Sequence, residues 1–374
     1  MKITVIGAGF GALTTIRTLR KRNRHVEITL IAPQPVFQYF PSLIWVPAGL
    51  RRRADILIDI RPLLDRLNIQ FHAGHVTGVE AEGRRVVTDR GAVSNDGLII
   101  ASGGRFIKKL SGIEHAITLC EGIDAAEQIR DRLAAMQGGA VAIGFGGNPD
   151  EPAAVRGGPM FELLFGLDRL LRQQGRRDRF KLVFFNPSPR PGNRLGDATV
   201  DRLLERMKKF DIEMRIGARP LRFEAAKVVT EKGEFAADLI LFMPGMTGPA
   251  WAADAPFPLS PGGMIQADAH ARVPGFERVY VVGDSGSYPA PDWAPKQAHM
   301  ADLMAVAASE NLLADFDGRP ADRSFKWELL CLIDMLDRAM LVYRTEKRQF
   351  VTPPCRLLHW AKRFFEWWYL RSIR

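Results

Sequence analysis

The sequence predicts an α/β protein with two tandem Rossmann-like halves and a C-terminal amphipathic helical region. Three observations predict this fold. The chain begins with a strand, a glycine-rich turn and a helix; a hairpin-and-strand motif recurs at one constant offset; and the last twenty or so residues combine tryptophans with basic residues. We expect the first half at residues 1–110, the second half at 111–250, a return to the first half at 251–320, and the C-terminal hairpin and helix at 321–374.

The composition is that of an ordinary globular protein. Of the 374 residues, 47% are hydrophobic and 25% are charged, and this length allows two or three domains with cores of their own. The net charge of +10 indicates an anionic partner, either a nucleic acid or an anionic membrane surface. No nucleic-acid-binding motif accompanies the charge, so we expect no nucleic-acid partner.

Targeting signals and cysteine clusters are not evident. Met1 and Lys2 lead directly into the first strand, so we expect no signal peptide, and no run of about 18 apolar residues predicts a membrane-spanning helix. Cys120, Cys331 and Cys355 are too few and too scattered for a disulfide framework or a four-ligand zinc site. We expect no metal, and one redox-active cysteine pair is left open.

The first turn has the pattern of a dinucleotide-binding loop. Gly7-x-Gly9-x-Gly11 lies between the strand "KITVI" and a helix-like stretch. The first glycine allows a tight turn, the second lets a pyrophosphate approach the backbone, and the third lets the helix pack closely. A βα turn without a ligand is the alternative. The second strand ends in Ala32-Pro33-Gln34, without the carboxylate that usually holds a ribose.

An internal repeat indicates two such halves. Residues 86–91 read "VVTDRG" and residues 228–233 read "VVTEKG", and an aspartate with an apolar run follows each, from Asp96 and from Asp238. All of these match at an offset of 142 residues without a gap. The second half would then begin near residue 139.

The second glycine turn is interrupted. Gly144-x-Gly146 is followed by Asn148, where a third glycine is due, and then by two prolines. The next strand, "FKLVFFN", ends at Asn186 and offers no carboxylate to a nicotinamide ribose. Nucleotide binding is therefore less well supported in the second half than in the first.

Two more strand ends complete the pattern. "LIIASGG" contains Ala101, Ser102 and Gly103 after its apolar run, and "VYVVGD" ends in Gly283 and Asp284, whose carboxylate can hold a ribityl or ribose hydroxyl. Alone, a Gly-Asp pair is a common turn. Together with the first turn and the duplication, these stretches indicate a two-dinucleotide-binding-domain flavoprotein.

At these residues the chain resembles the sulfide:quinone oxidoreductase and flavocytochrome c sulfide dehydrogenase group, which is related to the type II NADH dehydrogenases. Residues 28–50 resemble its second strand and the proline-containing loop along the flavin, "RGGPMFE" its C-x-G-P-x-x-E segment, and "RLLHWAKRFFEWWYL" its membrane-binding helix. The resemblance implies bound FAD. The predicted FAD-binding residues are Gly7, Gly9, Phe10, Gly11, Ala32, Pro33, Pro41, Ser42, Val76, Ala101, Ser102, Gly103, Gly283, Asp284 and Lys296.

The resemblance also implies three catalytic residues. Cys331 matches the C-terminal redox cysteine of the family, Cys120 matches a third cysteine near the flavin in some members, and Glu162 matches an acid proposed for proton transfer. Each has a structural alternative, because free cysteines are often buried and a glutamate suits the first turn of a helix. A Cys120–Cys331 disulfide is left open.

The donor site departs from the family. Arg156 stands where the family has its second redox cysteine, so the usual attack of sulfide on a disulfide there is excluded. Two family histidines match Asp124 and Asn193. Arg156 is expected either to bind an anion or stabilise a reduced flavin, or to be a solvated loop residue. Lys296 is expected to stabilise the anionic edge of a reduced flavin, with a surface lysine as the alternative.

Residues 356–371 form an amphipathic helix on a helical wheel. Tryptophan, phenylalanine and leucine side chains fill one side, whereas Arg356, His359, Lys362, Arg363 and Glu366 fill the other. This pattern predicts a helix lying in a membrane interface, and packing on the protein's own core or at a homodimer interface is the alternative. A peripheral membrane flavoprotein most naturally reduces quinone, and Phe40, Tyr343 and Phe350 are candidates for lining the quinone pocket.

The leading interpretation is a peripheral FAD oxidoreductase on the cytoplasmic side of the cell membrane. It would pass electrons from sulfide or a related small sulfur donor to quinone, with an altered donor site at Arg156. A type II NADH:quinone dehydrogenase is the first alternative, weakened by Asn148 and Asn186. A non-catalytic flavoprotein or electron carrier, which keeps the flavin and loses the donor, is the second.

Overall fold

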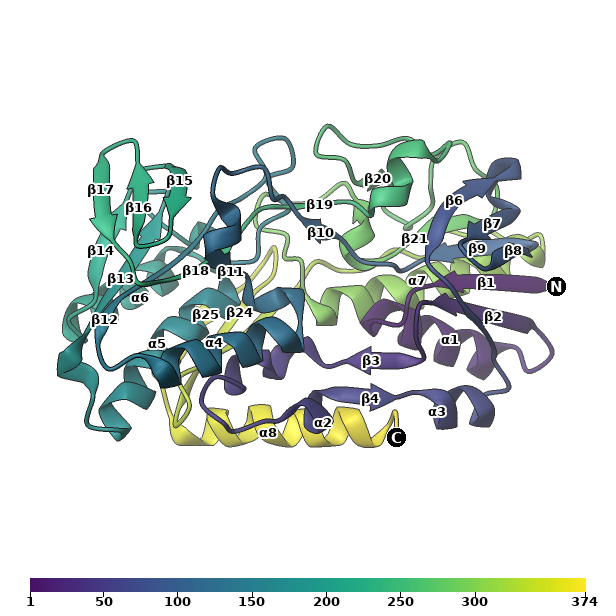
Figure 1. Cartoon of the computed structure of the whole chain (residues 1–374). Helices are drawn as coiled ribbons and strands as arrows, with labels where there is room; N and C mark the ends of the chain where they lie inside the picture. Colours follow the sequence, from purple (N-terminus) through teal and green to yellow (C-terminus); the bar gives the residue numbers. More distant parts are fainter.

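The computed structural model describes residues 1–374 and contains two parallel five-stranded sheets (Figure 1). The first sheet has the order β21 (Val279–Val281), β9 (Gly97–Ile100), β1 (Lys2–Ile6), β2 (Glu27–Ala32) and β5 (Gln70–Ala73). The second has the order β11 (Ala116–Ile117), β18 (Leu239–Met243), β12 (Gly139–Phe145), β13 (Phe180–Asn186) and β14 (Glu213–Ile216). The predicted fold class, two Rossmann-like halves and a C-terminal helix, is confirmed.

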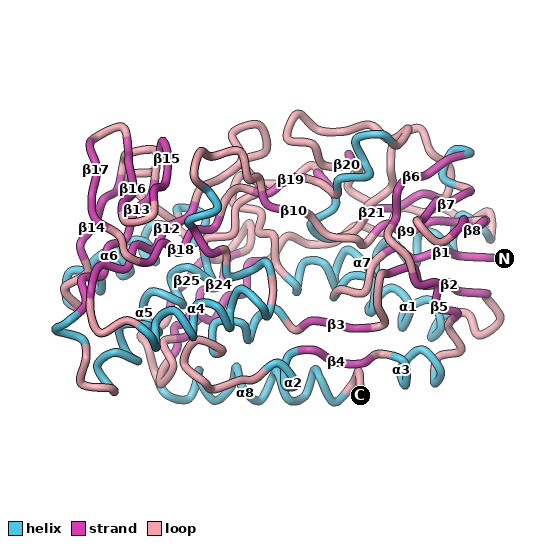
Figure 2. The backbone as a smooth tube through the Cα atoms, viewed as in Figure 1, coloured by secondary structure: helices cyan, strands magenta, loops and turns pink.

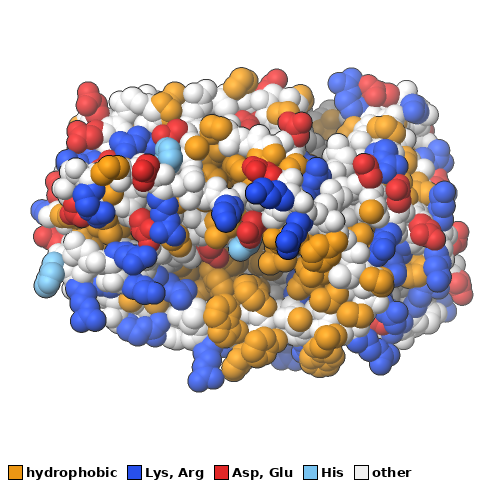
Figure 3. Space-filling view, turned by 180° about the vertical axis from the view of Figure 1, so that it is seen from behind, with side chains coloured by type: hydrophobic (Ala, Val, Ile, Leu, Met, Phe, Trp, Pro, Cys, Tyr) orange, Lys and Arg blue, Asp and Glu red, His pale blue; other side chains and the backbone are white.

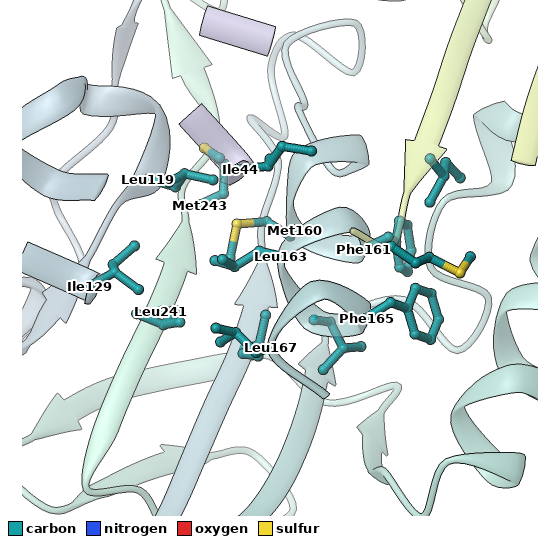
Figure 4. Close-up of a cluster of buried hydrophobic side chains, with 14 of the residues drawn as sticks. Ile44, Leu119, Ile129, Met160, Phe161, Leu163, Phe165, Leu167, Leu241 and Met243 are labelled. Carbon is teal, nitrogen blue, oxygen red and sulfur yellow. The ribbon is translucent and has the colours of Figure 1, made fainter. Parts of the chain in front are cut away.

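Helices cover the sheets, as buried parallel strands require. In the first half, α1 (Phe10–Arg22) and α7 (Ala298–Phe316) pack against each other. The second half has α4 (Ile123–Ala135), α5 (Gly158–Gln173) and α6 (Asp197–Lys209). Figure 4 shows the buried cluster that joins α5 to the second sheet, in which Met160 and Leu163 lie with Leu241 and Met243 of β18. This packing fixes the first turn of α5.

The repeat seen in the sequence is a repeat of structure. Each half carries a three-stranded antiparallel sheet: β6 (Val76–Glu80), β7 (Arg85–Thr88) and β8 (Gly91–Ser94) in the first, and β15 (Pro220–Glu224), β16 (Lys227–Thr230) and β17 (Gly233–Ala236) in the second. In both hairpins a threonine hydroxyl donates to the carbonyl of a turn glycine at 2.8 Å, from Thr88 to Gly91 and from Thr230 to Gly233.

The repeated aspartates have equivalent roles. The Asp96 carboxylate accepts a hydrogen bond from the backbone N–H of Lys2 at 2.7 Å, and that of Asp238 accepts one from Ala140 at 2.8 Å. Each aspartate therefore ties the hairpin of its half to the first strand of the same half.

Short paired segments connect the two halves (Figure 2). The strands β10 (Arg105–Phe106) and β19 (Met246–Thr247) run antiparallel where the chain passes between them. Further small elements include β3 (Val36–Gln38), the 3-10 helix Phe40–Trp45, α2 (Arg53–Ile56), β4 (Leu57–Asp59), α3 (Arg61–Arg66), β20 (Ile265–Gln266) and β22 (Gly286–Ser287).

The chain ends in a hairpin and a helix. The strands β23 (Leu329–Asp334), β24 (Ala339–Arg344) and β25 (Gln349–Val351) form an antiparallel sheet, and α8 (Arg356–Arg371) follows. In Figures 1 and 2, α8 runs along the lower edge of the molecule, below α5. No helix combines the length and apolar character needed to cross a bilayer.

Several polar residues of α8 face the protein, and its tryptophans and phenylalanines face away from it. His359 and Glu366 are 5% and 4% exposed, whereas Trp360 and Trp367 are 59% and 53% exposed. The Nε of Arg51 donates to both carboxylate oxygens of Glu366 at 2.9 Å. Hydrophobic side chains consequently gather along the lower edge of the surface in Figure 3. The alternative in which the aromatic face packs on the protein's own core is wrong.

Candidate active site

The carboxyl ends of four parallel strands of the first sheet meet at one edge. Ile6 of β1 pairs with Ile31 of β2 and with Ile100 of β9, and Ile100 pairs with Val281 of β21. Ligands of open α/β sheets bind outside such an edge. The predicted residues that end these strands or follow them directly are Gly7, Ala32, Pro33, Ala101, Ser102, Gly103, Gly283 and Asp284.

Each glycine of the first turn has its own geometric reason. Gly7 has a φ of +114°, and a Cβ on it would collide with the carbonyl oxygen of Ala101. A Cβ on Gly9 would meet no protein atom within 4 Å, so this backbone faces open space at the start of α1. A Cβ on Gly11 would lie 3.0 Å from Cγ2 of Val282, which lets α1 approach the sheet. This geometry suits a pyrophosphate held at the N-terminus of α1.

Ser42 presents a buried hydroxyl without a partner. It lies beside Pro41 in the 3-10 helix, is 1% exposed, and its Oγ forms no hydrogen bond. Because an unsatisfied buried hydroxyl costs about 1–3 kcal/mol, a polar ligand atom beside it would stabilise the protein. Of the other predicted contacts, Phe10 packs against Phe37 with ring centres 4.9 Å apart, and Val76 is partly buried at the start of β6.

Arg156 forms an ion pair with Asp284 at the edge of the first sheet. Their side chains are 19% and 16% exposed, so the alternative of a solvated loop arginine is wrong. The sequence alone does not predict this pair, because 128 residues separate its members. The fixed charge of Arg156 is thereby held where β21 ends.

Lys296 also turns inward. Its Nζ donates to the carbonyl oxygen of Gly286 at 2.5 Å and lies 5.8 Å from the ring centre of Tyr288. Burial lowers the pKa of Lys296, although the charges of Asp284 and Glu151 oppose this change. The alternative of a fully solvated surface lysine is wrong.

The two predicted catalytic cysteines lie within the electrostatic reach of one carboxylate, that of Glu162. A Cβ on Gly158, in the first turn of α5, would lie 3.7 Å from the Sγ of Cys331. Burial, and secondarily Glu162, raises the pKa of the Cys331 thiol to about 12. Burial raises the pKa of Cys120 against the opposing charge of Arg156, and Glu162 raises it further. All cysteines are free, so the structure contains no Cys120–Cys331 disulfide.

Glu162 itself pairs with a residue of α8. It is 7% exposed, its carboxylate forms an ion pair with Lys362, and its Oε1 accepts the backbone N–H of Asp334 at 2.8 Å. Burial raises the pKa of Glu162 to about 7, and the charge of Lys362 opposes the rise. The sequence alone does not place Lys362 at the site. The spacing of His359, Lys362 and Glu366 along one face of the helix was the available signal.

The interrupted second loop is held in place by the protein itself. The Nδ2 of Asn148 donates to the carbonyl oxygens of Met246 at 2.9 Å and Gly262 at 3.1 Å. At the end of β13, the Nδ2 of Asn186 donates to the carbonyl oxygen of Phe145 at 2.8 Å. Both side chains are buried and engaged, so neither is free to hold a nicotinamide ribose in this conformation.

The remaining predicted residues lie in varied surroundings. The Asp124 side chain is 88% exposed and pairs with Arg53, and Asn193 begins a 3-10 helix. The rings of Tyr343 and Phe350 lie tilted to each other across β24 and β25 with centres 5.3 Å apart, while Phe40 packs partly buried on the second-half core.

Comparison with known proteins identifies the family. Residues 1–305 match the family model described as pyridine nucleotide-disulphide oxidoreductase. The chain is 24% identical to a sulfide-quinone reductase of Aquifex aeolicus, over all of this chain and 91% of that protein. It is 30% identical over 145 residues to a type II NADH:quinone oxidoreductase of Staphylococcus aureus, covering 36% of this chain and 35% of that one.

Solved structures share the fold. The sulfide:quinone oxidoreductase of Aquifex aeolicus superposes with a TM-score of 0.91 at 24% identity, covering all of this chain and 91% of that one. NDH2 of Plasmodium falciparum in complex with NADH gives a TM-score of 0.77 at 13% identity, over 97% and 94% of the two chains.

The chain therefore belongs to the pyridine nucleotide-disulphide oxidoreductase family and is an FAD-dependent oxidoreductase. The open backbone at Gly9 and the unpaired hydroxyl of Ser42 fit this cofactor, since both offer polar groups that no protein atom uses. We retain the predicted FAD-binding residues as candidates on this basis.

The variant Gly9→Ala tests the pyrophosphate site. We expect it to fold normally, because the added Cβ meets no protein atom and the φ of Gly9 is −86°. Retention of FAD should weaken by about tenfold or more, since the methyl group would keep a phosphate from the backbone N–H groups. Flavin content after gel filtration and a titration of the apoprotein measure this. Gly78→Ala is the control, because a Cβ there is equally free of neighbours; equal flavin loss in both variants would contradict the assignment.

Proposed function

We propose that this member of the pyridine nucleotide-disulphide oxidoreductase family is a membrane-associated FAD enzyme that passes electrons from sulfide or a related small sulfur donor to quinone. The observation that carries the proposal is the position of Cys331 against the start of α5, the helix that carries Glu162, together with a second nucleotide loop that is held by its own side chains. Sulfide and quinone are named for the Aquifex aeolicus relative that matches the whole chain.

The closed loop favours a sulfur donor over NADH. A nicotinamide nucleotide would need the second turn open and an acceptor for its ribose hydroxyls. The side-chain amides of Asn148 and Asn186 instead donate hydrogen bonds to backbone carbonyls of neighbouring segments. Because the chain is similar to type II NADH:quinone oxidoreductases, the reduction experiment below also tests NADH as a donor.

FAD, when bound, supplies the two-electron acceptor for the donor half of the reaction and the two-electron donor for the quinone half. The protein groups prepare the site. The charges of Arg156 and Lys296 favour an anionic donor and a reduced, anionic flavin edge, while Asp284 keeps Arg156 in position. Sulfide anion that gives up two electrons to become zero-valent sulfur also releases one proton, and Glu162 is the proposed acceptor of that proton.

The thiols require such an acceptor. Because burial keeps Cys331 protonated, its sulfur becomes a nucleophile only when a base removes the proton. Glu162, whose pKa of about 7 lies near neutrality, is suited to accept a proton and to release it again. Because Arg156 occupies the position of the family's second redox cysteine, Cys331 and Cys120 are the thiols that we propose to react with the sulfur donor.

The outward face of α8 supports membrane attachment. Six large apolar side chains of the helix are more than half exposed, and they are accompanied by basic residues (Figure 3). Burying such a face in the acyl boundary is favourable, and the arginines suit an anionic surface. We include attachment to the cytoplasmic face of the cell membrane in the proposal. The apolar residues are Leu357, Trp360, Phe364, Phe365, Trp367 and Trp368.

The donor is identified by anaerobic reduction of the purified holoenzyme. Sulfide should bleach the flavin absorbance within seconds, whereas NADH should leave it oxidised. Cys331→Ser should slow bleaching by sulfide by about a hundredfold or more, because a hydroxyl is a much weaker nucleophile. Cys355→Ser, at an exposed cysteine, is the control and should behave as wild type. Bleaching by NADH alone would overturn the proposed donor, and bleaching by dithionite alone would favour a non-catalytic flavoprotein.

The pH dependence of the same reaction tests Glu162. Below a pKa of about 7 the carboxyl group is protonated and cannot accept a proton, so the rate of flavin reduction by sulfide should rise as pH increases through about 7. Glu162→Gln should be slower and should lose the part of that rise that Glu162 contributes, keeping only the part due to sulfide. Sulfide ionises over a similar range, so the profile of the variant separates the two titrations. An identical rise in the variant would exclude Glu162 as the base.

Vesicle binding tests α8. Replacing Trp367 and Trp368 by Ser should weaken co-sedimentation with anionic phospholipid vesicles by at least about tenfold, since each tryptophan loses its burial in lipid. Flavin content and the circular dichroism spectrum should be unchanged, because both side chains are exposed. Leu221→Ser on β15 removes a similarly exposed apolar residue elsewhere and should not affect binding. Unaltered binding of the tryptophan variant would remove the support for this surface.

A further inference from the structure

Four ionisable side chains form a connected buried cluster beneath α8. Lys362 of α8 pairs with Glu162 of α5, and His359 of α8 pairs with Asp334 at the end of β23. The two pairs are joined because the backbone N–H of Asp334 donates to the Oε1 of Glu162 at 2.8 Å. The proposed donor chemistry uses Glu162, but it gives no role to His359 and Asp334.

Asp334 is arranged to orient His359. Its side chain is fully buried, its Oδ1 accepts hydrogen bonds from Nε1 of Trp45 at 3.0 Å and from the N–H of Leu336 at 2.9 Å, and its Oδ2 lies 2.7 Å from Nδ1 of His359. Burial alone would raise the pKa of Asp334, but the hydrogen bond from His359 and the charge of Lys362 outweigh burial and lower it. Asp334 is therefore a carboxylate, and its contact fixes a hydrogen on Nδ1 of His359.

The second ring nitrogen of His359 is left available. No protein group hydrogen-bonds to its Nε2, which is also not among the fully enclosed polar atoms without a partner. The ring lies between Trp45 and Trp360, with centres 6.0 Å and 5.9 Å away, and Trp360 belongs to the outward aromatic face of α8. His359 thus stands at the boundary between the buried cluster and the surface that we assign to lipid.

We propose that His359, oriented by Asp334, donates a proton to quinone during its reduction. This inference rests on the proposed function, which supplies quinone as the acceptor. Quinol formation takes two electrons from the reduced cofactor and two protons. As one quinone oxygen gains its hydrogen, the Nε2–H bond of His359 breaks, and the ring is protonated again from solvent at the membrane surface. The other quinone oxygen takes its proton from solvent directly. The contact between the Asp334 carboxylate and Nδ1 holds the ring in one orientation.

A purely structural role for the pair, anchoring α8, gives a different expectation. The same helix face already carries a buried anchor, the ion pair of Glu366 with Arg51. Glu366→Gln weakens an anchor without removing a histidine, so it is the matched control. His359→Gln keeps a side-chain donor for Asp334 and cannot supply a proton at neutral pH, whereas His359→Ala leaves space for added imidazole.

The test separates electron transfer from proton transfer. The holoenzyme is reduced with one equivalent of dithionite, which makes the experiment independent of the natural donor, and is then mixed with decylubiquinone or with ferricyanide. His359→Gln should slow reoxidation by decylubiquinone by about a hundredfold and leave reoxidation by ferricyanide unchanged, because ferricyanide takes electrons without protons. Imidazole should restore part of the quinone rate in His359→Ala. Binding of decylubiquinone, followed by tryptophan fluorescence, should change by less than about twofold.

Each result has a defined meaning. If the wild type reduces ferricyanide but not decylubiquinone, the proposed acceptor fails, and with it the premise of this inference. If wild type and His359→Gln reduce decylubiquinone equally fast, the proton role of His359 is overturned while the acceptor stands. If both acceptors slow together in His359→Gln, or if Glu366→Gln behaves as His359→Gln does, the pair serves only to hold the helix, and the inference is likewise overturned.

Discussion

The pairing of buried charges beneath α8 is the constraint on which the rest of the lower half of the molecule depends. Lys362 and Glu162 are both largely removed from solvent, and neither could remain charged there alone, because desolvation of an isolated charge costs several kcal/mol. The pair therefore fixes the rotation of α8. Once Lys362 points inward, His359 and Glu366 follow on the same face, and the tryptophans are forced outward. One contact thereby sets both the donor-side carboxylate and the surface proposed to meet the membrane.

The duplication makes the two halves comparable, and the comparison shows how they have diverged. Both retain the hairpin with its threonine turn and the aspartate that ties the hairpin to the first strand. In the first half, Gly9 leaves its backbone open to a phosphate. In the second, Asn148 bridges two neighbouring carbonyls and holds the corresponding loop against the protein. The first half thus has a glycine turn whose backbone is open to a nucleotide. In the second half, hydrogen bonds within the protein close the corresponding turn.

The two sides of the cluster suit different chemistry. On the side toward the thiols, burial keeps Cys331 and Cys120 protonated and raises the pKa of Glu162, an arrangement that requires proton transfer before sulfur can react. On the side toward the outward face of α8, Asp334 remains a carboxylate and orients His359. The backbone N–H of Asp334 links the two sides through its hydrogen bond to Glu162. The C-terminal helix therefore contributes side chains to the proposed proton transfers as well as a surface to the proposed membrane contact.

The sequence by itself determined the local and periodic features: the glycine turn at Gly7, the repeat at a fixed offset, the strand ends at Ala101 and Gly283, and the amphipathic pattern of the last helix. These are visible because turn geometry and hydrophobic periodicity act over a few residues. Only the tertiary structure decided that Arg156 pairs with Asp284, that Lys362 reaches Glu162, and which side of α8 is covered. A helical wheel shows that two faces differ, but which face is buried depends on partners that are distant in sequence, and an ion pair between such residues leaves no local trace.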